Sequence, residues 1–465
     1  MAETITIPEH LRAKAQEKGW PDDLLQQALA AGASAEQLIG YMDRGISVEQ
    51  ARQVMAGQAA PPAAADAPPV SSAGASDALK AKAADAGWPM ELIEKALAMG
   101  GAEADLMNYM NMGVTAEQAA QFMEQGSGGG FEVDLSWMHV PTEWNTRAKP
   151  TKHGLTLEAI NIGKYGEIPD TWPYKTEMPR GAVPIPGVEA MGYSIFEKQE
   201  VWSDACAKLY EEAIQRRWRP ATDVPWASIE PLPDDLERAI DQICTHISEK
   251  EQMEADVLGR WEPEISYGYH EVKLYLATTI FENARAVEVF RKRALSNGGG
   301  LGVQSSGWGF RSIVDGRNFT EMVTIQMILH DSVTLAQYIY GAKYAKNAAE
   351  AYIFAHCAQD KARHIAYGVT HLQYVLSNRP ERREEIQRYF DKGEGMLVQD
   401  DRKDPSVREA FAIYFAGGKD KIGEGLKLYD QMRKTAMRQY LGRLKWATLD
   451  RSDRLAPELK AYLAD

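Results

Sequence analysis

The chain has 465 residues, of which 45% are hydrophobic and 25% are charged, values typical of a globular protein with a large core. Its formal net charge of −14 argues against nucleic acid or an anionic membrane as a partner, because such binding depends on clustered Lys and Arg. No apolar run approaches the roughly 18 residues that span a bilayer, and no signal-peptide pattern opens the sequence. The cysteines Cys206, Cys244 and Cys357 are scattered, as is typical of a reducing compartment, so we expect a cytoplasmic protein without disulfides.

An internal duplication occupies the N-terminal part of the chain. Residues 11–55 match residues 79–123 at a constant offset of 68, and the tripeptide Gly-Trp-Pro recurs at Gly19–Pro21 and Gly87–Pro89. Each copy is predicted to be a small helical module. Neither copy contains a metal-ligand or nucleophile pattern, so we interpret the pair as devices that dock a protein partner.

Two of the predicted helix starts carry capping-box spacing, in which two side chains satisfy free N–H groups reciprocally: Ser34 with Gln37, and Thr115 with Gln118. Shifts in composition then divide the chain into five parts. These parts are repeat module 1 (1–58), an Ala/Pro-rich linker (59–75), repeat module 2 (76–125), a Gly linker with an irregular Trp/Pro-rich arm (126–192), and a helical bundle (193–465).

The part from 193 to 465 has helical periodicity almost throughout. Long amphipathic segments joined by short turns indicate an antiparallel bundle, so the fold class is all-α. The predicted helices are 194–218, 233–261, 269–296, 319–345, 348–377, 381–393, 407–416 and 423–447.

Four of these helices carry a polar side chain in the middle of an apolar stripe, namely Glu251, Asn283, Asp331 and Lys361. Ionisable groups are seldom buried without a partner, because the loss of hydration costs several kcal/mol. We therefore expect the four helices to point these side chains at one another.

Four segments of the predicted bundle resemble the ferritin-like dimetal-carboxylate superfamily, in the branch of the bacterial multicomponent monooxygenase hydroxylases and the radical-generating subunit of ribonucleotide reductase. They are YEEAIQRRWRPATDVPW (210–226), SEKEQMEA (248–255), EVKLYLATTIFENARAVEVFRKR (271–293) and DKARHIAYG (360–368). The resemblance implies a ferritin-like bundle in which two carboxylates and two E-x-x-H motifs hold two metal ions.

The ligand positions implied by the resemblance are largely substituted in this chain. They fall on Glu251, Asn283, Ala286, Asp331, Lys361 and His364. Asn283 and Ala286 replace the strong ligands of the second helix, and Lys361 replaces the glutamate of the last motif. The family's radical tyrosine corresponds to Phe290.

Lys361 favours a centre without metal. An ammonium beside two metal ions would be repelled, whereas without metal it neutralises the carboxylates of Glu251 and Asp331. We therefore expect no cofactor, and we interpret Arg285 and Arg363 as structural partners of Glu282 and Asp360. The catalytic residues, if any, are unknown from the sequence.

The first functional hypothesis is an accessory, β-type subunit of an oxygenase-like complex, in homo- or hetero-oligomers that include a metal-bearing paralogue. The alternative is an O2-dependent oxidoreductase of monooxygenase type, which uses a metal-free centre or a displaced iron or manganese site. That displaced site would be built from Glu251, Asp331, His330, His356 and His364. A third hypothesis is an inert scaffold whose repeat modules bind proteins.

Overall fold

The computed structural model describes residues 7–30, 35, 38–39, 42, 48, 51–52, 75–99, 101–111, 114–120, 135–140, 146–297 and 299–464. The chain divides into two compact units, Met1–Leu135 and Ser136–Asp465. Within the described ranges every regular element is a helix, and β-structure is limited to isolated bridges. None of the described helices is both long enough and apolar enough to cross a bilayer.

The first unit contains two small sets of helices whose apolar cores match position by position. The first set is α1 (Glu9–Lys18) and α2 (Asp22–Ala30), and the second is α5 (Asp77–Asp85), α6 (Met90–Ala98) and α7 (Glu103–Asn111). Buried side chains recur at the 68-residue offset: Leu11 and Leu79, Ala15 and Ala83, Trp20 and Trp88, Leu25 and Ile93, Ala28 and Ala96, Leu38 and Leu106, Met42 and Met110. The duplicated sequence therefore builds the same apolar layer twice.

A left-handed glycine follows the first helix of each set. Gly19 and Gly87 both have a φ of +71°, a conformation that glycine adopts without steric cost. The tryptophan that follows each glycine donates its backbone N–H to a carbonyl of the preceding helix, over 2.8 Å in both sets. Because both copies form the same turn, the tripeptide Gly-Trp-Pro occurs in both.

The predicted capping box of the second module is present. Thr115 N–H donates to the side-chain oxygen of Gln118 over 2.9 Å, and Gln118 N–H donates to the Thr115 hydroxyl over 3.2 Å. Ser34, Gln37, the Ala/Pro linker up to residue 74 and the Gly linker after residue 125 lie outside the described residues.

An irregular arm occupies residues 146–192 of the second unit, with a short helix α9 (Leu157–Ile160). Arg180 links this arm to α12 of the bundle (His270–Leu295). Its side chain is buried, donates to Glu271 Oε2 over 2.9 Å, and donates to the Tyr165 carbonyl over 3.2 Å. Glu271 is 1% exposed, so the ion pair is shielded from water and fixes the arm against the bundle.

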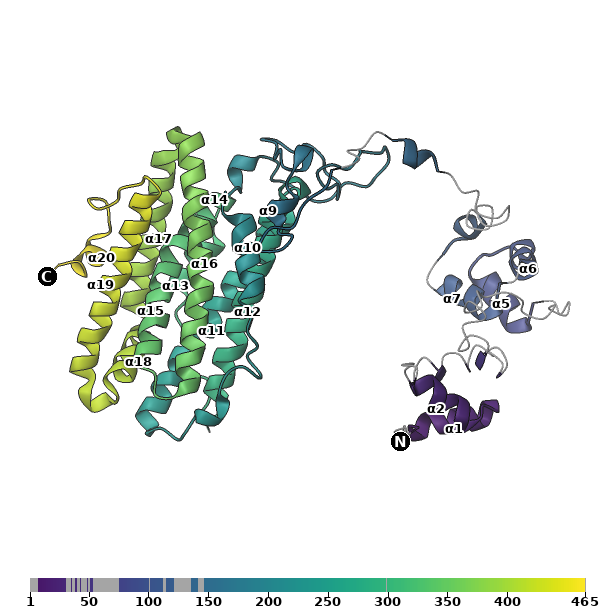
Figure 1. Cartoon of the computed structure of the whole chain (residues 1–465), viewed down its shortest axis with the longest axis horizontal. Coiled ribbons are helices and arrows are strands. Elements are labelled where there is room, and N and C mark those ends of the chain that lie inside the picture. The colour runs from purple at the N-terminus through teal and green to yellow at the C-terminus, as the bar shows by residue number, and fades with distance from the viewer. Residues whose placement is uncertain are drawn as a thin grey trace. The chain divides into compact units, whose positions relative to one another are not determined.

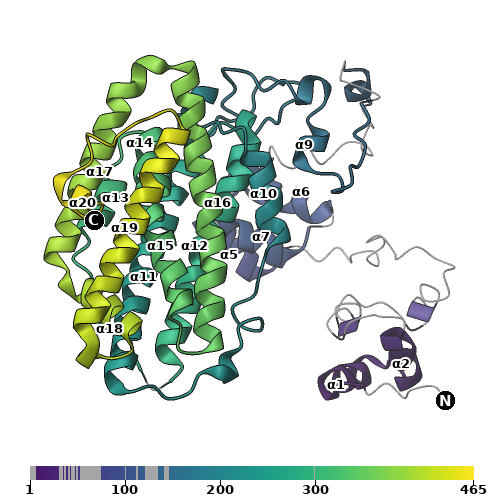
Figure 2. The ribbon, with the colours of Figure 1, turned by 60° about the vertical axis from the view of Figure 1, so that its left-hand side comes forward.

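The second unit is built on long antiparallel helices (Figures 1 and 2). α11 (Asp234–Trp261) packs on α12 (His270–Leu295), and α15 (Asp331–Lys343) packs on α16 (Ala348–Asn378). Three more helices complete the body: α17 (Arg383–Lys403), α18 (Pro405–Ala416) and α19 (Ile422–Trp446). The predicted all-α fold, an antiparallel helical bundle, is confirmed.

Local sequence explains where these helices begin and end. α11 follows Pro233 and has Asp234, Asp235 and Glu237 in its first turn, where the helix dipole favours negative charge. The side chain of Asn347 accepts from the backbone N–H of Glu350 over 2.9 Å and so caps α16.

The predicted helix 319–345 is divided into three consecutive segments. These are α14 (Phe319–Val323), a π-helical stretch (Thr324–His330) and α15. Because π-helical turns are wider than α-helical turns, the stretch alters the helical register immediately before Asp331.

Two predicted helix boundaries are wrong. The helix predicted from residue 194 begins only at α10 (Cys206–Gln215), because the backbone N–H groups of Ser194 and Ile195 donate to the Glu264 carbonyl instead. α17 continues ten residues beyond the predicted end at Gly393. Gly393 is a position of close packing, since a Cβ there would lie 2.9 Å from Leu329 Cδ2.

Candidate functional site

The four polar positions expected to converge do lie together in the middle of the bundle. Glu251 on α11, Asn283 on α12, Asp331 on α15 and Lys361 on α16 are each at most 1% exposed. Apolar side chains of the same helices enclose this level on both sides, among them Ile247, Leu258, Leu276, Phe290 and Ile353. The site is therefore a polar cluster within an apolar core, where each charge needs a partner.

The ammonium of Lys361 occupies the centre of the cluster. Its Nζ lies 3.0 Å from Glu251 Oε2 and 3.1 Å from Asp331 Oδ1, and it also forms an ion pair with Glu254. It donates a further hydrogen bond to Asn283 Oδ1 over 3.2 Å. One covalently attached cation thus bridges carboxylates from two helices and an amide from a third.

A second buried ammonium, that of Lys250, was not predicted from the sequence. Its Nζ lies 2.6 Å from Glu254 Oε1 and 3.7 Å from Asp331 Oδ1, and it donates to the Thr334 hydroxyl. The segment SEKEQMEA contained the signal, because residues three and four apart share one face of a helix. Glu254 lies three residues after Glu251 and four residues after Lys250, so α11 supplies two carboxylates and one cation.

A second group of ions adjoins the first on the side of α12. His364 Nε2 lies 2.9 Å from Glu282 Oε2, while His364 Nδ1 lies 3.8 Å from Asp331 Oδ2. Arg363 pairs with both Glu282 and Asp360. The contacts of Arg363 therefore agree with the expectation that it pairs with Glu282 and Asp360.

Arg285 closes this second group toward the surface of the bundle. Its guanidinium lies 2.6 Å from Asp360 Oδ2, and its carbon lies 4.7 Å from the centre of the Trp218 ring. The indole N–H of Trp218 donates to the same carboxylate oxygen over 3.3 Å. The aromatic ring and the ion pair thus stabilise one another at the edge of the cluster.

A tyrosine, Tyr338, donates a hydrogen bond to Glu251. Its hydroxyl donates to Glu251 Oε1 over 2.6 Å, and its ring stacks on Phe290 with 5.6 Å between ring centres. Phe290 itself offers no hydroxyl at the position where the resemblance places a radical tyrosine. Burial and the nearby Glu251 carboxylate raise the pKa of Tyr338 well above its usual range, so its phenol stays protonated.

The charges of the two groups nearly cancel. There are five carboxyl groups and four permanently charged bases, and their members are Glu251, Glu254, Glu282, Asp331, Asp360, Lys250, Arg285, Lys361 and Arg363. Burial lowers the pKa of His364 well below its usual range, and Lys361 lowers it further, so the imidazole is neutral. One extra proton would bring the cluster to neutrality.

Asp331 is the group best placed to hold that proton. Burial and the neighbouring Glu254 carboxylate raise the pKa of Asp331 to about 7, although Lys361 and Lys250 oppose the shift. Glu254 behaves in the opposite way: burial disfavours its charge, but Lys250 and Lys361 lower its pKa to about 2. Burial also disfavours the charge of Lys361, yet Asp331, Glu251 and Glu254 raise its pKa well above the usual value.

These residues do not fit a pair of metal ions. Two cations need several anionic oxygens and imidazoles around them, and here two ammonium groups already use the carboxylate oxygens. Asn283 Oδ1 accepts from Lys361, and the Ala286 side chain has no donor atom. The chemistry of the donor set thus opposes a dimetal centre at these positions.

Two of the five residues of the alternative displaced site, His330 and His356, have their contacts elsewhere. His330 Nε2 lies 3.4 Å from the Ser312 hydroxyl, and the His356 ring stacks on Tyr352 with 3.7 Å between centres. His364 faces Glu282, as described above. Among the residues that the structure describes, no group of three or more His, Cys, Asp or Glu side chains is arranged to hold a metal ion.

Comparisons with known proteins give structural neighbours alone. No family model and no curated protein matches the chain. The chain is similar to solved structures of R2-like ligand-binding oxidases: a variant with an aerobically reconstituted Mn/Fe cofactor is 18% identical, with a TM-score of 0.38 over 52% of this chain and 93% of the other. The form without metal cofactor is also 18% identical, with a TM-score of 0.36 over 51% and 94%.

A further variant, with an aerobically reconstituted Fe/Fe cofactor, is 20% identical, with a TM-score of 0.36 over 52% of this chain and 93% of that one.

Replacing the central ammonium should destabilise the bundle strongly. Lys361→Met leaves three buried carboxylates with Lys250 as their remaining cation, so we expect a loss of about 3–5 kcal/mol in the free energy of unfolding. Urea titration at pH 7.5, followed by tryptophan fluorescence, measures this change. The control is Lys445→Met, because Lys445 is exposed and lies 3.6 Å from Asp450, so its loss should cost less than about 1 kcal/mol. Equal stability of the two variants would contradict the central role of Lys361.

The raised pKa of Asp331 predicts a specific dependence of stability on pH. Folded Asp331 keeps its proton up to about pH 7, whereas an unfolded aspartate loses it near 3.8, so its stabilising contribution is complete below 3.8 and is lost as the pH rises through 7. Wild type should therefore lose stability relative to Asp331→Asn by a few kcal/mol between pH 4 and pH 7.5. Urea titrations at four pH values measure the difference, with the exposed carboxyl variant Asp453→Asn as control. A difference that is constant across this range would exclude the protonated state of Asp331.

Proposed function

We propose that this chain is a divergent ferritin-like protein of the oxygenase class, in which lysine side chains have replaced the dimetal centre. Its role is that of an accessory, β-type subunit of an oxygenase-like complex. The observation that carries this proposal is the position of the Lys361 ammonium, within 3.1 Å of both Glu251 and Asp331. An enzyme that binds metal at this level has no use for such a cation.

A purely structural centre would account for the rest of the geometry. Buried ion pairs between α11, α15 and α16 hold these helices in register without any exchangeable ligand. The buried arginines, their carboxylate partners and Tyr338 also link neighbouring helices. The subunit keeps the shape of the bundle and leaves the chemistry to a partner.

Unpaired apolar surface supports a subunit role. Phe281 projects from the outer side of α12 and is 54% exposed, and Leu295 on the same helix is 58% exposed. Large exposed apolar side chains on a rigid helix are common at protein interfaces. We propose that this side of α12 faces a metal-bearing paralogue.

The N-terminal modules would recruit another partner. Each has its own buried core, so each keeps its outer surface for binding. In the second module Tyr109 is 50% exposed and Met99 is 44% exposed, and residues of these types are common in contact surfaces. Their duplication would raise the effective concentration of a weak binding site.

The two other hypotheses have less support. An oxidoreductase with a displaced iron or manganese ion requires His330 and His356 to approach Glu251, and their contacts with Ser312 and Tyr352 oppose this. An inert scaffold would give no reason for the large exposed apolar side chains of Phe281 and Leu295 on α12. The following measurements separate these possibilities.

Metal analysis tests the loss of the dimetal centre. The full chain, produced with added iron and manganese, should retain less than about 0.1 transition-metal ion per chain by plasma mass spectrometry, because bound ions would face two ammonium groups. One or two ions per chain would overturn the proposal. As a positive test, the combined variant Lys250→Met, Asn283→Glu, Ala286→His and Lys361→Glu should gain metal binding. A matched control carries Met, Gln, Asn and Gln at the same four positions and should bind none.

The subunit role is tested by assembly. The subunit role predicts that a gene near that of this chain encodes a paralogue with both E-x-x-H motifs. The two full chains should elute together at a fixed stoichiometry when they are co-expressed. Phe281→Lys should weaken this complex by at least about tenfold, since it places a charge in an apolar contact. The control Arg291→Lys lies on the same helix and should leave the complex unchanged. A chain that stays separate from the paralogue would favour the scaffold hypothesis.

A further inference from the structure

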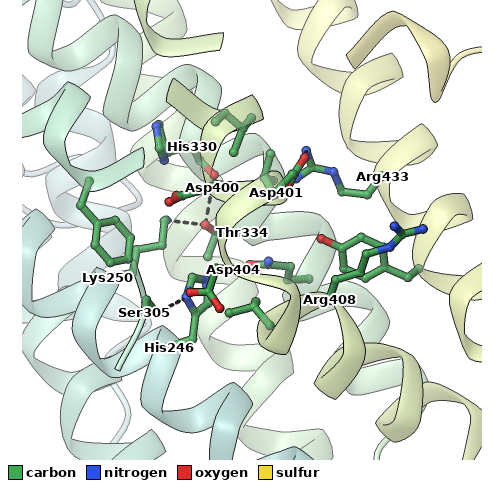
Figure 3. Close-up of a pocket in the computed structure, with 16 residues that line it drawn as sticks. His246, Lys250, Ser305, His330, Thr334, Asp400, Asp401, Asp404, Arg408 and Arg433 are labelled. Atoms are coloured by element: carbon green, nitrogen blue, oxygen red, sulfur yellow. Dashed lines mark hydrogen bonds and ion pairs between the residues drawn. The ribbon is translucent and has the colours of Figure 1, made fainter. Parts of the chain in front are cut away.

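A separate cavity of about 50 Å³ is lined in part by Lys250 (Figure 3). Residues of α11, α13 (Trp308–Val314), α15, α17, α18 and α19 line it, together with His330 of the π-helical stretch and the loop at Ser305. The volume is sufficient for a few water molecules or a ligand of a few atoms. Lys250 belongs to both places: it lines this cavity, and its ammonium pairs with Glu254 of the ion cluster.

Two aspartates at the mouth of this cavity have no cationic partner. Asp400 accepts from the Ser306 hydroxyl over 3.3 Å, and Asp404 accepts from Ser306 N–H over 3.1 Å. No lysine or arginine in the described part of the chain forms an ion pair with either carboxylate. Burial and the adjacent Asp401 and Asp404 raise the pKa of Asp400, as expected for a carboxylate that lacks a counter-ion.

The cations that line the cavity are already paired. Arg433 lies 2.5 Å from Asp401, Arg408 lies 3.2 Å from Asp430, and Lys250 belongs to the cluster described above. Unpaired negative charge therefore remains inside the cavity, whereas unpaired positive charge does not.

The inner wall of the cavity offers further hydrogen-bond acceptors. Gln337 lines it, is 5% exposed, and forms no hydrogen bond with any described group, although a buried amide costs free energy when unpaired. Burial and the nearby Lys250 lower the pKa values of His246 to about 4 and of His330 to about 3, so both imidazoles are neutral. The ring of Phe310 stacks on His246, with 5.9 Å between their centres.

We infer that this cavity binds a small primary ammonium ion, the protonated form of an aliphatic amine with a few heavy atoms. The ammonium would donate to Asp400 and Asp404, and the Gln337 carbonyl would accept from the ligand. Phe310 provides an aromatic surface for its charge and its methylene groups. An anionic ligand would meet unpaired carboxylates, and the described residues form no group that could hold a metal ion.

This inference does not depend on the proposed subunit role. The cavity lies outside the cluster at Lys361, and its acidic residues come from α17 and the turn that follows it. The ligand could regulate the protein or be a substrate passed to a partner, and in either case the binding chemistry is the same.

Calorimetric titration of the full chain with methylammonium chloride tests the inference, with sodium chloride and sodium acetate at equal ionic strength as references. Methylammonium should bind to one site per chain, and sodium and acetate should give no saturable signal. Asp400→Asn and Asp404→Asn should each weaken binding about tenfold or more, the effect of removing one charge-assisted hydrogen bond. The exposed control Asp453→Asn should bind as wild type does.

Circular dichroism shows whether each variant is folded, and Gln337→Leu provides a variant that keeps both carboxylates and should also weaken binding. Three results would overturn the inference. They are no saturable binding of methylammonium to the folded wild type, an affinity in all three cavity variants equal to that of the wild type, or tighter binding of acetate than of methylammonium at the same site.

Discussion

The structure depends on the balance of charge around one buried ammonium. Lys361 is 1% exposed and lies between carboxylates that would each be costly to bury alone. Loss of hydration opposes every charge in this cluster, and mutual attraction offsets that cost only when the partners are close and fully hydrogen-bonded. The apolar layers on either side can pack because the polar level between them is nearly neutral. The identity of the cluster residues therefore determines the packing of four helices.

Other parts of the bundle follow the same rule with arginine in place of lysine. Arg293 is fully buried between Glu237 and Glu350, at 2.6 Å and 2.8 Å, and joins α12 to α11 and α16. Arg451 lies 3.0 Å from Glu394 and ties the C-terminal segment to α17. Arginine suits these places because its planar guanidinium can contact two carboxylates at once. Lysine suits the centre, where a compact charge must be shared among groups on several sides.

The fold was predictable because long amphipathic segments and short turns leave few arrangements other than an antiparallel bundle. The meeting of Glu251, Asp331 and Lys361 was equally accessible, since each is a charged residue within an apolar stripe. Lys250 and Glu254 were not predicted, because the ligand positions implied by the resemblance do not include them. Their four-residue spacing nevertheless places them on one face of α11. The non-helical start of the segment from residue 194 depends on backbone bonds to the distant Glu264, which no local pattern reveals. The cavity beside Lys250 combines side chains from six α-helices, and its existence follows from packing alone.

The covalent attachment of the Lys361 ammonium has a consequence for the life of the protein in the cell. A bundle that is completed by bound ions can mature only as fast as those ions are delivered, and it competes for them with every other acceptor. Here the positive charge is made together with the polypeptide, in a fixed ratio of one per chain. Synthesis during iron shortage would therefore still yield a bundle whose buried polar centre is complete.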